Sequence, residues 1–220
     1  MSKPSLNKTS FANQAKLEGL ASNFSFISIS SAFYLILGTT GGMIAHYNHS
    51  SLLPALNIQL MQNNWMNPIA IVALTTGILL ISSYLLEGWS HSYLKAKASI
   101  AAYFGPLNVL SLVYLAVISS VSEELFFRAG LLPYTGIFWG GLVFGLVHLG
   151  PNGRISAWTL WAGVAGVLLG WVYQTTNSLW PVWSIHFLVN LVGMISLRRS
   201  YLRTLEYVQK TPGLNIEGRL

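Results

Sequence analysis

The sequence contains no cysteine and no aspartate, and it carries very little charge of either sign. Without cysteine, disulfides, thiolate nucleophiles and thiolate metal sites are excluded. Without aspartate, any carboxylate chemistry depends on the glutamates. These are Glu18, Glu87, Glu123, Glu124, Glu206 and Glu217. A metal site, if one exists, would be built from histidine, glutamate or asparagine.

The scarcity of charge also indicates the solvent around the chain. Only 8% of the 220 residues are charged, whereas 53% are hydrophobic, and a soluble domain usually carries about 25% charged residues. The net charge of +6 and the pI near 9.7 do not indicate a nucleic-acid partner, because the basic residues lie beside apolar runs of membrane length and form no continuous basic face. Lipid is therefore the expected surrounding.

Six apolar runs predict an all-α fold, a polytopic membrane bundle with about six transmembrane helices. The runs are 24–45, 68–86, 107–133, 137–150, 156–174 and 179–197. The first is too long for the apolar core of a signal peptide and is expected to be an uncleaved anchor. The chain then divides into four parts. These are an amino-terminal cytoplasmic arm (1–23), two helices with an interfacial connection (24–106), a catalytic membrane core (107–197) and a basic cytoplasmic tail (198–220).

The positions of the basic residues predict the orientation of these helices. With the amino terminus in the cytoplasm, eleven of the twelve lysines and arginines fall in inside segments and none in outside loops. The exception is Arg128, which lies within an apolar run. The positive-inside rule therefore favours an even number of spans with both termini cytoplasmic.

The stretch 121–129, VSEELFFRA, places two carboxylates and a guanidinium directly after a long apolar run. A charge at the centre of a spanning helix costs at least ~2.5 kcal/mol, so a functional role is the first hypothesis. Glu124 and Arg128 share a helix face and are expected to form an ion pair. Glu123 points about 100° away, in line with Ser119 one turn earlier. We therefore predict Glu123 as the working base and the pair as its support; a purely structural ion cluster at a helix end is the alternative.

Three further polar residues lie in later apolar runs. His148 ends the fourth run, and His186 and Asn190 share one face of the sixth. At about 1.5 Å per residue from the outer turns, Glu123, His148 and Asn190 lie roughly 15 Å deep and His186 roughly 10 Å. Three helices thus bring polar groups to one layer, which predicts a single site. A core histidine bonded to a carbonyl is the alternative for each histidine taken alone.

Glycines are frequent in the fourth and fifth runs. They are Gly140, Gly141, Gly145, Gly163, Gly166 and Gly170. Small residues at such spacings allow helices to approach closely. We expect these glycines to serve close packing, or to leave room for a substrate backbone.

A carboxylate, two imidazoles and an amide around a water suit hydrolysis. Glu123 would remove a proton from water with help from His148, while His186 and Asn190 would donate to the developing oxyanion. The same residues allow a zinc site with Glu123, His148 and His186 as ligands and a fourth position for water. Both chemistries remain open at this point.

The polar motifs resemble those of the CPBP family, which includes CAAX prenyl endopeptidases and proteins of bacteriocin processing and immunity. Residues 123–128 are similar to its EExxxR motif, 144–148 to FxxxH and 186–190 to HxxxN. All three occur in this order inside apolar runs, and the similarity covers about residues 107 to 195.

The resemblance implies an α-helical intramembrane endopeptidase that cuts a peptide bond near the membrane surface. Its catalytic set would be Glu123, His148, His186 and Asn190, with Glu124, Arg128 and Phe144 as structural support. The expected partners are a peptide or protein substrate, prenylated or unmodified, and the lipid bilayer. The family has been described both as metalloproteases and as metal-free glutamate-type enzymes. We favour the version without a cofactor, because an unpaired Glu123 beside one histidine suffices to activate water.

Two other classes of function compete with this interpretation. A non-catalytic immunity or scaffold protein could retain the polar cluster for its structure alone. A proton-coupled transporter could use buried glutamate and histidine as a relay. Six spans without a visible internal repeat do not favour the transporter.

Overall fold

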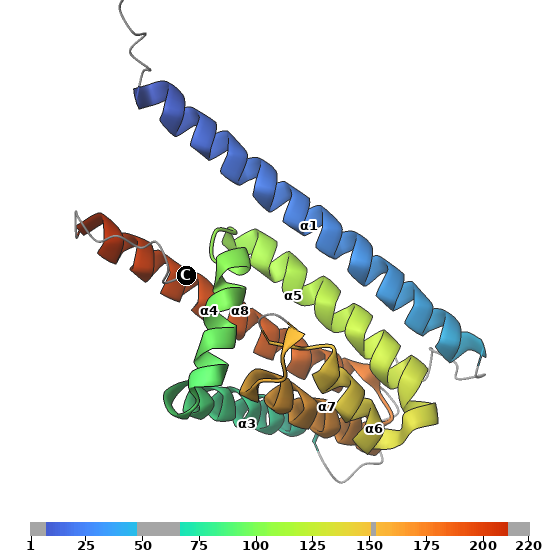
Figure 1. Cartoon of the computed structure of the whole chain (residues 1–220). Coiled ribbons are helices and arrows are strands. Elements are labelled where there is room, and N and C mark those ends of the chain that lie inside the picture. Colours follow the sequence, from blue (N-terminus) through green and yellow to red (C-terminus); the bar gives the residue numbers. More distant parts are fainter. Residues whose placement is uncertain (1–7, 48–66, 151–152, 211–220) are drawn as a thin grey trace, which may run out of the picture.

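The computed structural model describes residues 8–47, 67–150 and 153–210, and these are almost entirely helical. The elements are α1 (Lys8–Tyr47), α3 (Pro68–Trp89), α4 (His91–Phe104), α5 (Val109–Glu124), η2 (Leu125–Leu131), α6 (Leu132–Leu146), α7 (Ala157–Thr176) and α8 (Leu179–Lys210). Within these ranges there is no strand. The expected all-helical bundle is confirmed (Figure 1).

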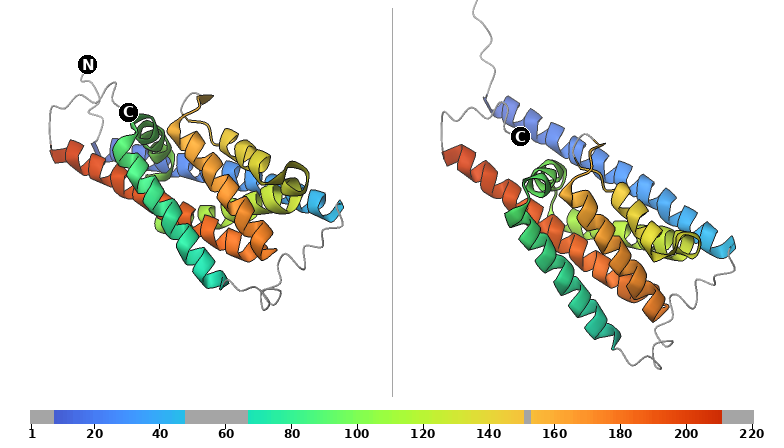
Figure 2. Two further views of the ribbon diagram at one scale, coloured as in Figure 1. Left: turned by 90° about the horizontal axis from the view of Figure 1, so that it is seen from below. Right: turned by 60° about the horizontal axis from the view of Figure 1, so that its bottom comes forward.

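Helices of membrane length account for much of the described chain. Four stretches among these residues are long and apolar enough to cross a membrane: Ser22–Tyr47, Pro68–Trp89, Val109–Leu146 and Leu179–Tyr207. The third contains α5, η2 and α6, between which the chain reverses direction (Figures 1 and 2). It therefore corresponds to two of the six expected runs. Helix α7 has 20 residues at the place of the fifth run but is not one of the four.

At both ends of the chain the structure differs from the expected amino-terminal arm and carboxy-terminal tail. Helix α1 begins at Lys8, so most of the expected amino-terminal arm is helical and continuous with the first span, and residues 1–7 lie outside the described residues. Helix α8 runs on to Lys210 through the arginines that follow the last apolar run, while 211–220 also lie outside the described residues. The expected outer loop, 48–66, is likewise not described.

Helix α4 is the short amphipathic connection between α3 and α5, and it runs across one end of the bundle (Figure 1). Ser90 caps its amino terminus by accepting a hydrogen bond from the backbone N–H of Tyr93. Lys97 on α4 forms an ion pair with Glu87 at the end of α3, with Nζ 2.9 Å from Oε2. This end of the bundle is the one for which the basic residues predict a cytoplasmic position.

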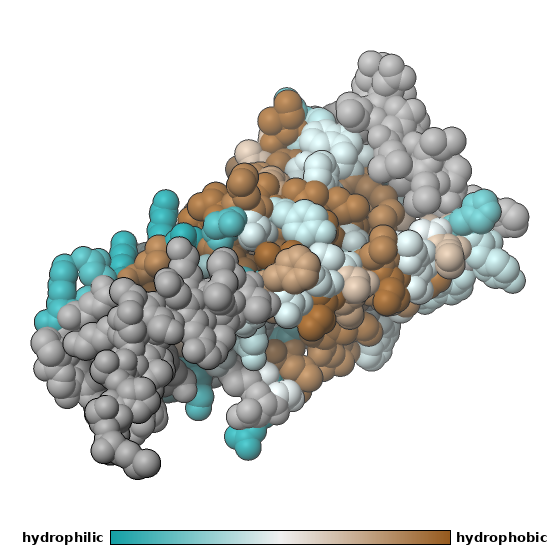
Figure 3. All heavy atoms as spheres, turned by 90° about the horizontal axis from the view of Figure 1, so that it is seen from above, coloured by the Kyte–Doolittle hydropathy of each residue, from teal (hydrophilic) through white to brown (hydrophobic). Residues whose placement is uncertain are grey.

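The outer surface of the bundle is apolar, as a lipid-facing surface requires. Large side chains such as Phe24, Ile69, Leu110 and Leu160 are more than three fifths exposed. On the face seen in Figure 3 apolar residues cover the middle, and hydrophilic residues gather towards one end. Because lipid tails are as apolar as these side chains, helix association must come from close packing and polar contacts rather than from the hydrophobic effect.

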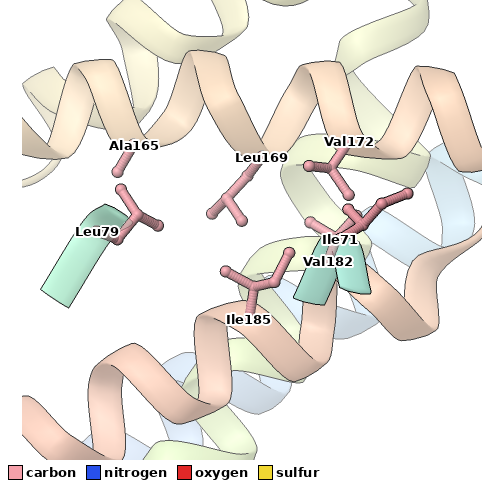
Figure 4. Close-up of a cluster of buried hydrophobic side chains, with 7 residues drawn as sticks. All are labelled: Ile71, Leu79, Ala165, Leu169, Val172, Val182 and Ile185. Atoms are coloured by element: carbon pink, nitrogen blue, oxygen red, sulfur yellow. The ribbon is translucent and has the colours of Figure 1, made fainter. Parts of the chain in front are cut away.

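One packed cluster joins α3, α7 and α8. It consists of Ile71, Leu79, Ala165, Leu169, Val172, Val182 and Ile185, and all seven are at least 92% buried (Figure 4). Val182 and Ile185 lie on α8, four residues and one residue before His186. The cluster therefore holds the part of α8 that carries the HxxxN motif.

Glycines set the contact between α6 and α7, which run antiparallel. A Cβ on Gly145 would lie 2.8 Å from Cα of Gly163, and a Cβ on Gly141 would lie 2.7 Å from the backbone nitrogen of Val167. At such distances only a hydrogen atom fits between the two backbones. The glycines therefore serve close packing, one of the two roles expected from the sequence.

Replacing Gly145 by alanine tests this contact. The added methyl group would meet the backbone of α7, and overpacking of this kind costs about 1–3 kcal/mol. We expect Gly145→Ala to lower the Tm of the purified protein in detergent, measured by tryptophan fluorescence. Gly77→Ala on α3 is the control, because a Cβ there has nothing within 4 Å. Equal Tm values for the two variants would contradict the close α6–α7 packing.

Candidate active site

The charged stretch of the sequence lies where the α-helix α5 changes into the π-helix η2. Glu123 and Glu124 are the last residues of α5, and Arg128 lies within η2. π-Helical turns are rare and are often found at functional sites. The side chains of Ser119 and Ser120, one turn earlier, are also buried, so the polar face of α5 points into the bundle as expected.

Glu124 is the centre of a buried network that joins three helices. Arg128 Nε lies 3.1 Å from Oε2 of Glu124, and both side chains are only 2% exposed. A second guanidinium nitrogen of Arg128 donates to the carbonyl oxygen of Gly166 on α7, at 3.2 Å. His186 on α8 places Nδ1 2.6 Å from Oε1 of Glu124. The ion pair expected from the four-residue spacing is thus present, and His186 adds a partner that the spacing did not indicate.

Both histidines turn the same ring nitrogen towards Glu123. His148 Nδ1 lies 2.7 Å from the carbonyl oxygen of Phe144, and because a carbonyl only accepts, Nδ1 carries the proton. The same reasoning assigns the Nδ1 proton of His186, whose partner is the carboxylate of Glu124. In each neutral ring Nε2 is then the free acceptor. The two Nε2 atoms each lie 3.8 Å from Oε2 of Glu123.

These distances leave Oε2 of Glu123 open for a third molecule. A separation of 3.8 Å is too long for a hydrogen bond, and a polar contact of this length is a place where water can bridge. Within the described residues no hydrogen bond reaches Oε2. The Glu123 side chain is 9% exposed and that of His148 is 25% exposed. A small polar molecule beside Oε2 could therefore contact the carboxylate and both imidazoles.

Asn190 lies one turn after His186 on α8 and is tied to α5. Its side-chain Nδ2 donates to Oγ of Ser119 at 3.1 Å, and Ser119 in turn donates to the carbonyl of Ala116. One hydrogen of the amide nitrogen remains for another acceptor. Asn190 therefore presents a fixed donor to the cavity that Glu123 also lines.

Phe144 supports the site through its ring rather than through a polar group. It is 4% exposed, and the guanidinium carbon of Arg128 lies 4.8 Å from the ring centroid. The ring also packs against His148 and His186, at centroid distances of 4.6 and 5.8 Å. A desolvated cation–π contact of this kind is worth up to about 2 kcal/mol. The first residue of the FxxxH motif therefore packs against the guanidinium of Arg128 and against both imidazoles.

The site opens into a cavity of about 450 Å³. Glu123, His148, Asn190 and Ser119 line it at the polar side. Much of the remaining wall is apolar or aromatic and comes from α3, α4, α7 and α8; it includes Leu80, Tyr84, Phe104, Trp158, Trp161 and Val189. The ion pair of Glu87 and Lys97 also borders the cavity. An apolar side chain could therefore be held beside the polar group.

Sequence reasoning did not identify Tyr34, which reaches the site from α1. It lines the same cavity as Glu123, and its phenol lies near enough to that carboxylate to interact with it electrostatically. The small residues Gly38, Gly41 and Ala45 follow it on one face of the helix and are buried. Their spacing is the only signal in the sequence that this face packs against other helices.

Glu123, His148 and His186 are also the residues that would hold a metal. Ligating histidines usually donate their second ring nitrogen to a carbonyl or carboxylate, as both imidazoles do here. In the part of the chain that is described, no group of three histidine, aspartate or glutamate side chains is placed to hold a metal ion. These three side chains are of the kinds that bind zinc, but the distances between their donor atoms would have to change for all three to coordinate one ion.

Comparison with known proteins places the site in a wider context. Residues 105–192 match the family described as Type II CAAX prenyl endopeptidase Rce1-like. The chain is similar to the uncharacterized protein YpbD of Bacillus subtilis (strain 168), with 24% identity over 129 residues that cover 57% of this chain and 67% of that protein. No solved structure matches the chain significantly. The matched segment contains all three polar motifs, whereas α1, α3 and α4 lie outside it.

Removing either member of the buried ion pair should lower the yield of folded protein. Arg128→Ala and Glu124→Ala each leave a charge without its partner in a dry environment, which costs about 3–5 kcal/mol. The folded yield and the Tm in detergent measure this effect.

The control for this prediction is Lys210→Ala. Lys210 and Glu206 have the same four-residue spacing on α8, with Nζ 2.6 Å from Oε1, but their side chains are 73% and 63% exposed. An exposed pair contributes about 0.3–0.5 kcal/mol. Normal yield and Tm for Arg128→Ala would count against a structural role for the buried pair.

Proposed function

We propose that this chain is an intramembrane endopeptidase, because residues 105–192 match the Type II CAAX prenyl endopeptidase Rce1-like family. It hydrolyses a peptide bond near the membrane surface. The family supports a CAAX-type membrane protease, and such a protease acts on a peptide or protein substrate. The observation that carries the finer proposal is the position of Glu123, whose free carboxylate oxygen faces two imidazoles 3.8 Å away at the edge of a cavity.

Glu123 and His148 activate the water in the proposed reaction. A water bound beside Oε2 of Glu123 gives a proton to the carboxylate, with Nε2 of His148 as the second acceptor. The water oxygen then forms a bond to the carbonyl carbon of the substrate, and the carbonyl π electrons move to its oxygen. Hydrolysis is completed when the oxyanion electrons re-form the C=O bond, the C–N bond breaks and the proton passes from the carboxyl group to the leaving amine.

His186 and Asn190 stabilise the oxyanion that forms in this step. Asn190 offers the amide hydrogen that is not bonded to Ser119. His186, held by Glu124, donates from Nε2 when its ring is protonated. Donors that are fixed before the reaction need no reorganisation when the negative charge develops, and a single such donor contributes about 10²–10³ in rate.

We favour the metal-free reaction. A carboxylate without a charged partner, beside a histidine whose proton is on the other nitrogen, is sufficient to activate water. With zinc, the same three residues Glu123, His148 and His186 would be the ligands, and the metal would supply Lewis-acid activation of the water. The effect of a chelator distinguishes the two reactions.

The decisive experiment is cleavage of peptides by the purified protein in lipid, followed by mass spectrometry. A mixture of prenylated and unmodified peptides shows which class is accepted. We expect Glu123→Gln to lower the rate at least about 100-fold, because the amide cannot accept the proton. The wild-type rate is expected to persist in the presence of a chelator.

Glu206→Gln is the matched control, because this glutamate is exposed on α8, far along the chain from the motifs. Loss of cleavage under chelator as well would favour zinc. Full activity of Glu123→Gln would contradict the role of this carboxylate. A wild-type chain that binds its partner but cleaves no peptide would favour the scaffold function.

The proposed orientation has both termini in the cytoplasm, so the Glu87–Lys97 side of the cavity faces the cytoplasm. Since the chain lacks cysteine, single introduced cysteines report their own side of the membrane. A membrane-impermeant reagent should label Asn177→Cys, in the turn between α7 and α8, in intact cells. Ser99→Cys on α4 should react only after permeabilisation. The opposite pattern would contradict the orientation.

A further inference from the structure

Helix α1 contributes to the site although it lies outside the segment 105–192 that matches the protease family. Tyr34, in the middle of this helix, lines the cavity together with Glu123. Its phenol lies near enough to the Glu123 carboxylate to interact with it electrostatically. The amino-terminal helix therefore brings a hydroxyl group to the cavity that holds the carboxylate on which the proposed reaction depends.

The position of α1 is determined by close contacts on the same face as Tyr34. A Cβ on Gly38 would lie 3.3 Å from Cβ of Ser122, the residue before Glu123. A Cβ on Gly41 would lie 2.4 Å from Cα of Phe126 in η2. The backbones of α1 and η2 thus touch directly, and α1 cannot move outward without losing this packing. These contacts, one and two turns after Tyr34, hold this residue at the cavity that Glu123 also lines.

Glu123 needs an orienting partner that the two histidines do not provide. Both Nε2 atoms are 3.8 Å from Oε2, beyond hydrogen-bond distance, and both Nδ1 protons are used by other acceptors. Arg128 is directed to Glu124 and to Gly166. Without a further donor the Glu123 carboxylate would be free to rotate about its last torsion. The phenol of Tyr34, which lines the same cavity, can supply this donor.

We propose that Tyr34 donates a hydrogen bond to the Glu123 carboxylate and is thereby a positioning residue of the active site, which holds this carboxylate so that one oxygen faces His148 and His186. This role rests on the proposed endopeptidase function. It implies that the catalytic unit includes α1 as well as the segment that carries the three motifs. Tyr34 acts through Glu123 and does not take part in bond making itself.

The test compares two variants that each remove one phenolic hydroxyl from the α1–α5 interface. Tyr34→Phe should lower kcat about tenfold with KM changed less than about twofold, since the hydrogen bond to the carboxylate is lost while the ring that lines the cavity is kept. Tyr114→Phe is the control. Its hydroxyl lies 2.9 Å from Oγ of Ser31 on α1, and it does not line the cavity. Equal kcat for the two variants, or a change in KM alone, would overturn the proposal.

A second readout does not depend on cleavage. The decrease in Tm caused by Tyr34→Phe should be present in the wild-type background and absent in Glu123→Ala, where the acceptor is missing. Glu123→Leu is the alternative background if Glu123→Ala does not fold. Equal decreases in both backgrounds would show that the phenol and the carboxylate are not coupled and would overturn the proposal. If Tyr34 and Glu123 are coupled but the wild-type protein cleaves no peptide, the contact between the two residues stands and the endopeptidase function is rejected.

Discussion

The charge of a carboxylate among transmembrane helices is stable only if polar partners in fixed positions compensate it. For Glu124 these partners come from several helices, so the arrangement of the bundle depends on them. They are Arg128 in the following turn and His186 on α8. Arg128 also binds the carbonyl of Gly166 on α7. One charge thus joins α5, η2, α7 and α8. Because Glu123 is the preceding residue on the same helix, its direction follows from the same contacts.

The two adjacent glutamates have opposite environments for a geometric reason. Neighbouring residues on a helix point about 100° apart, so they cannot share partners. Glu124 is almost fully buried, with a guanidinium and an imidazole in contact. Glu123 has two imidazoles at 3.8 Å and an oxygen that no hydrogen bond reaches within the described residues. One carboxylate stabilises the fold, and the other is available to a substrate or a water.

Close backbone approaches allow such a small chain to surround the polar group. The glycines of α6 bring α7 near enough for Gly166 to accept from Arg128. Gly41 of α1 touches the backbone of η2 and so brings Tyr34 to Glu123. In lipid, where burial of apolar surface gives little driving force between helices, these contacts take the place of a hydrophobic core. The apolar cluster of α3, α7 and α8 fills the remaining space (Figure 4).

The sequence by itself determined the class of fold, the glycine-rich packing faces and the polar residues of the site. It also determined the ion pair of Glu124 with Arg128, since both lie within one stretch of helix and their spacing is local. The tertiary structure alone decided the reversal of the chain after α5, the bond of His186 to Glu124 and the approach of Tyr34. Partners 62 and 89 residues apart meet only after helices have packed, and neither periodicity nor spacing encodes which faces then touch.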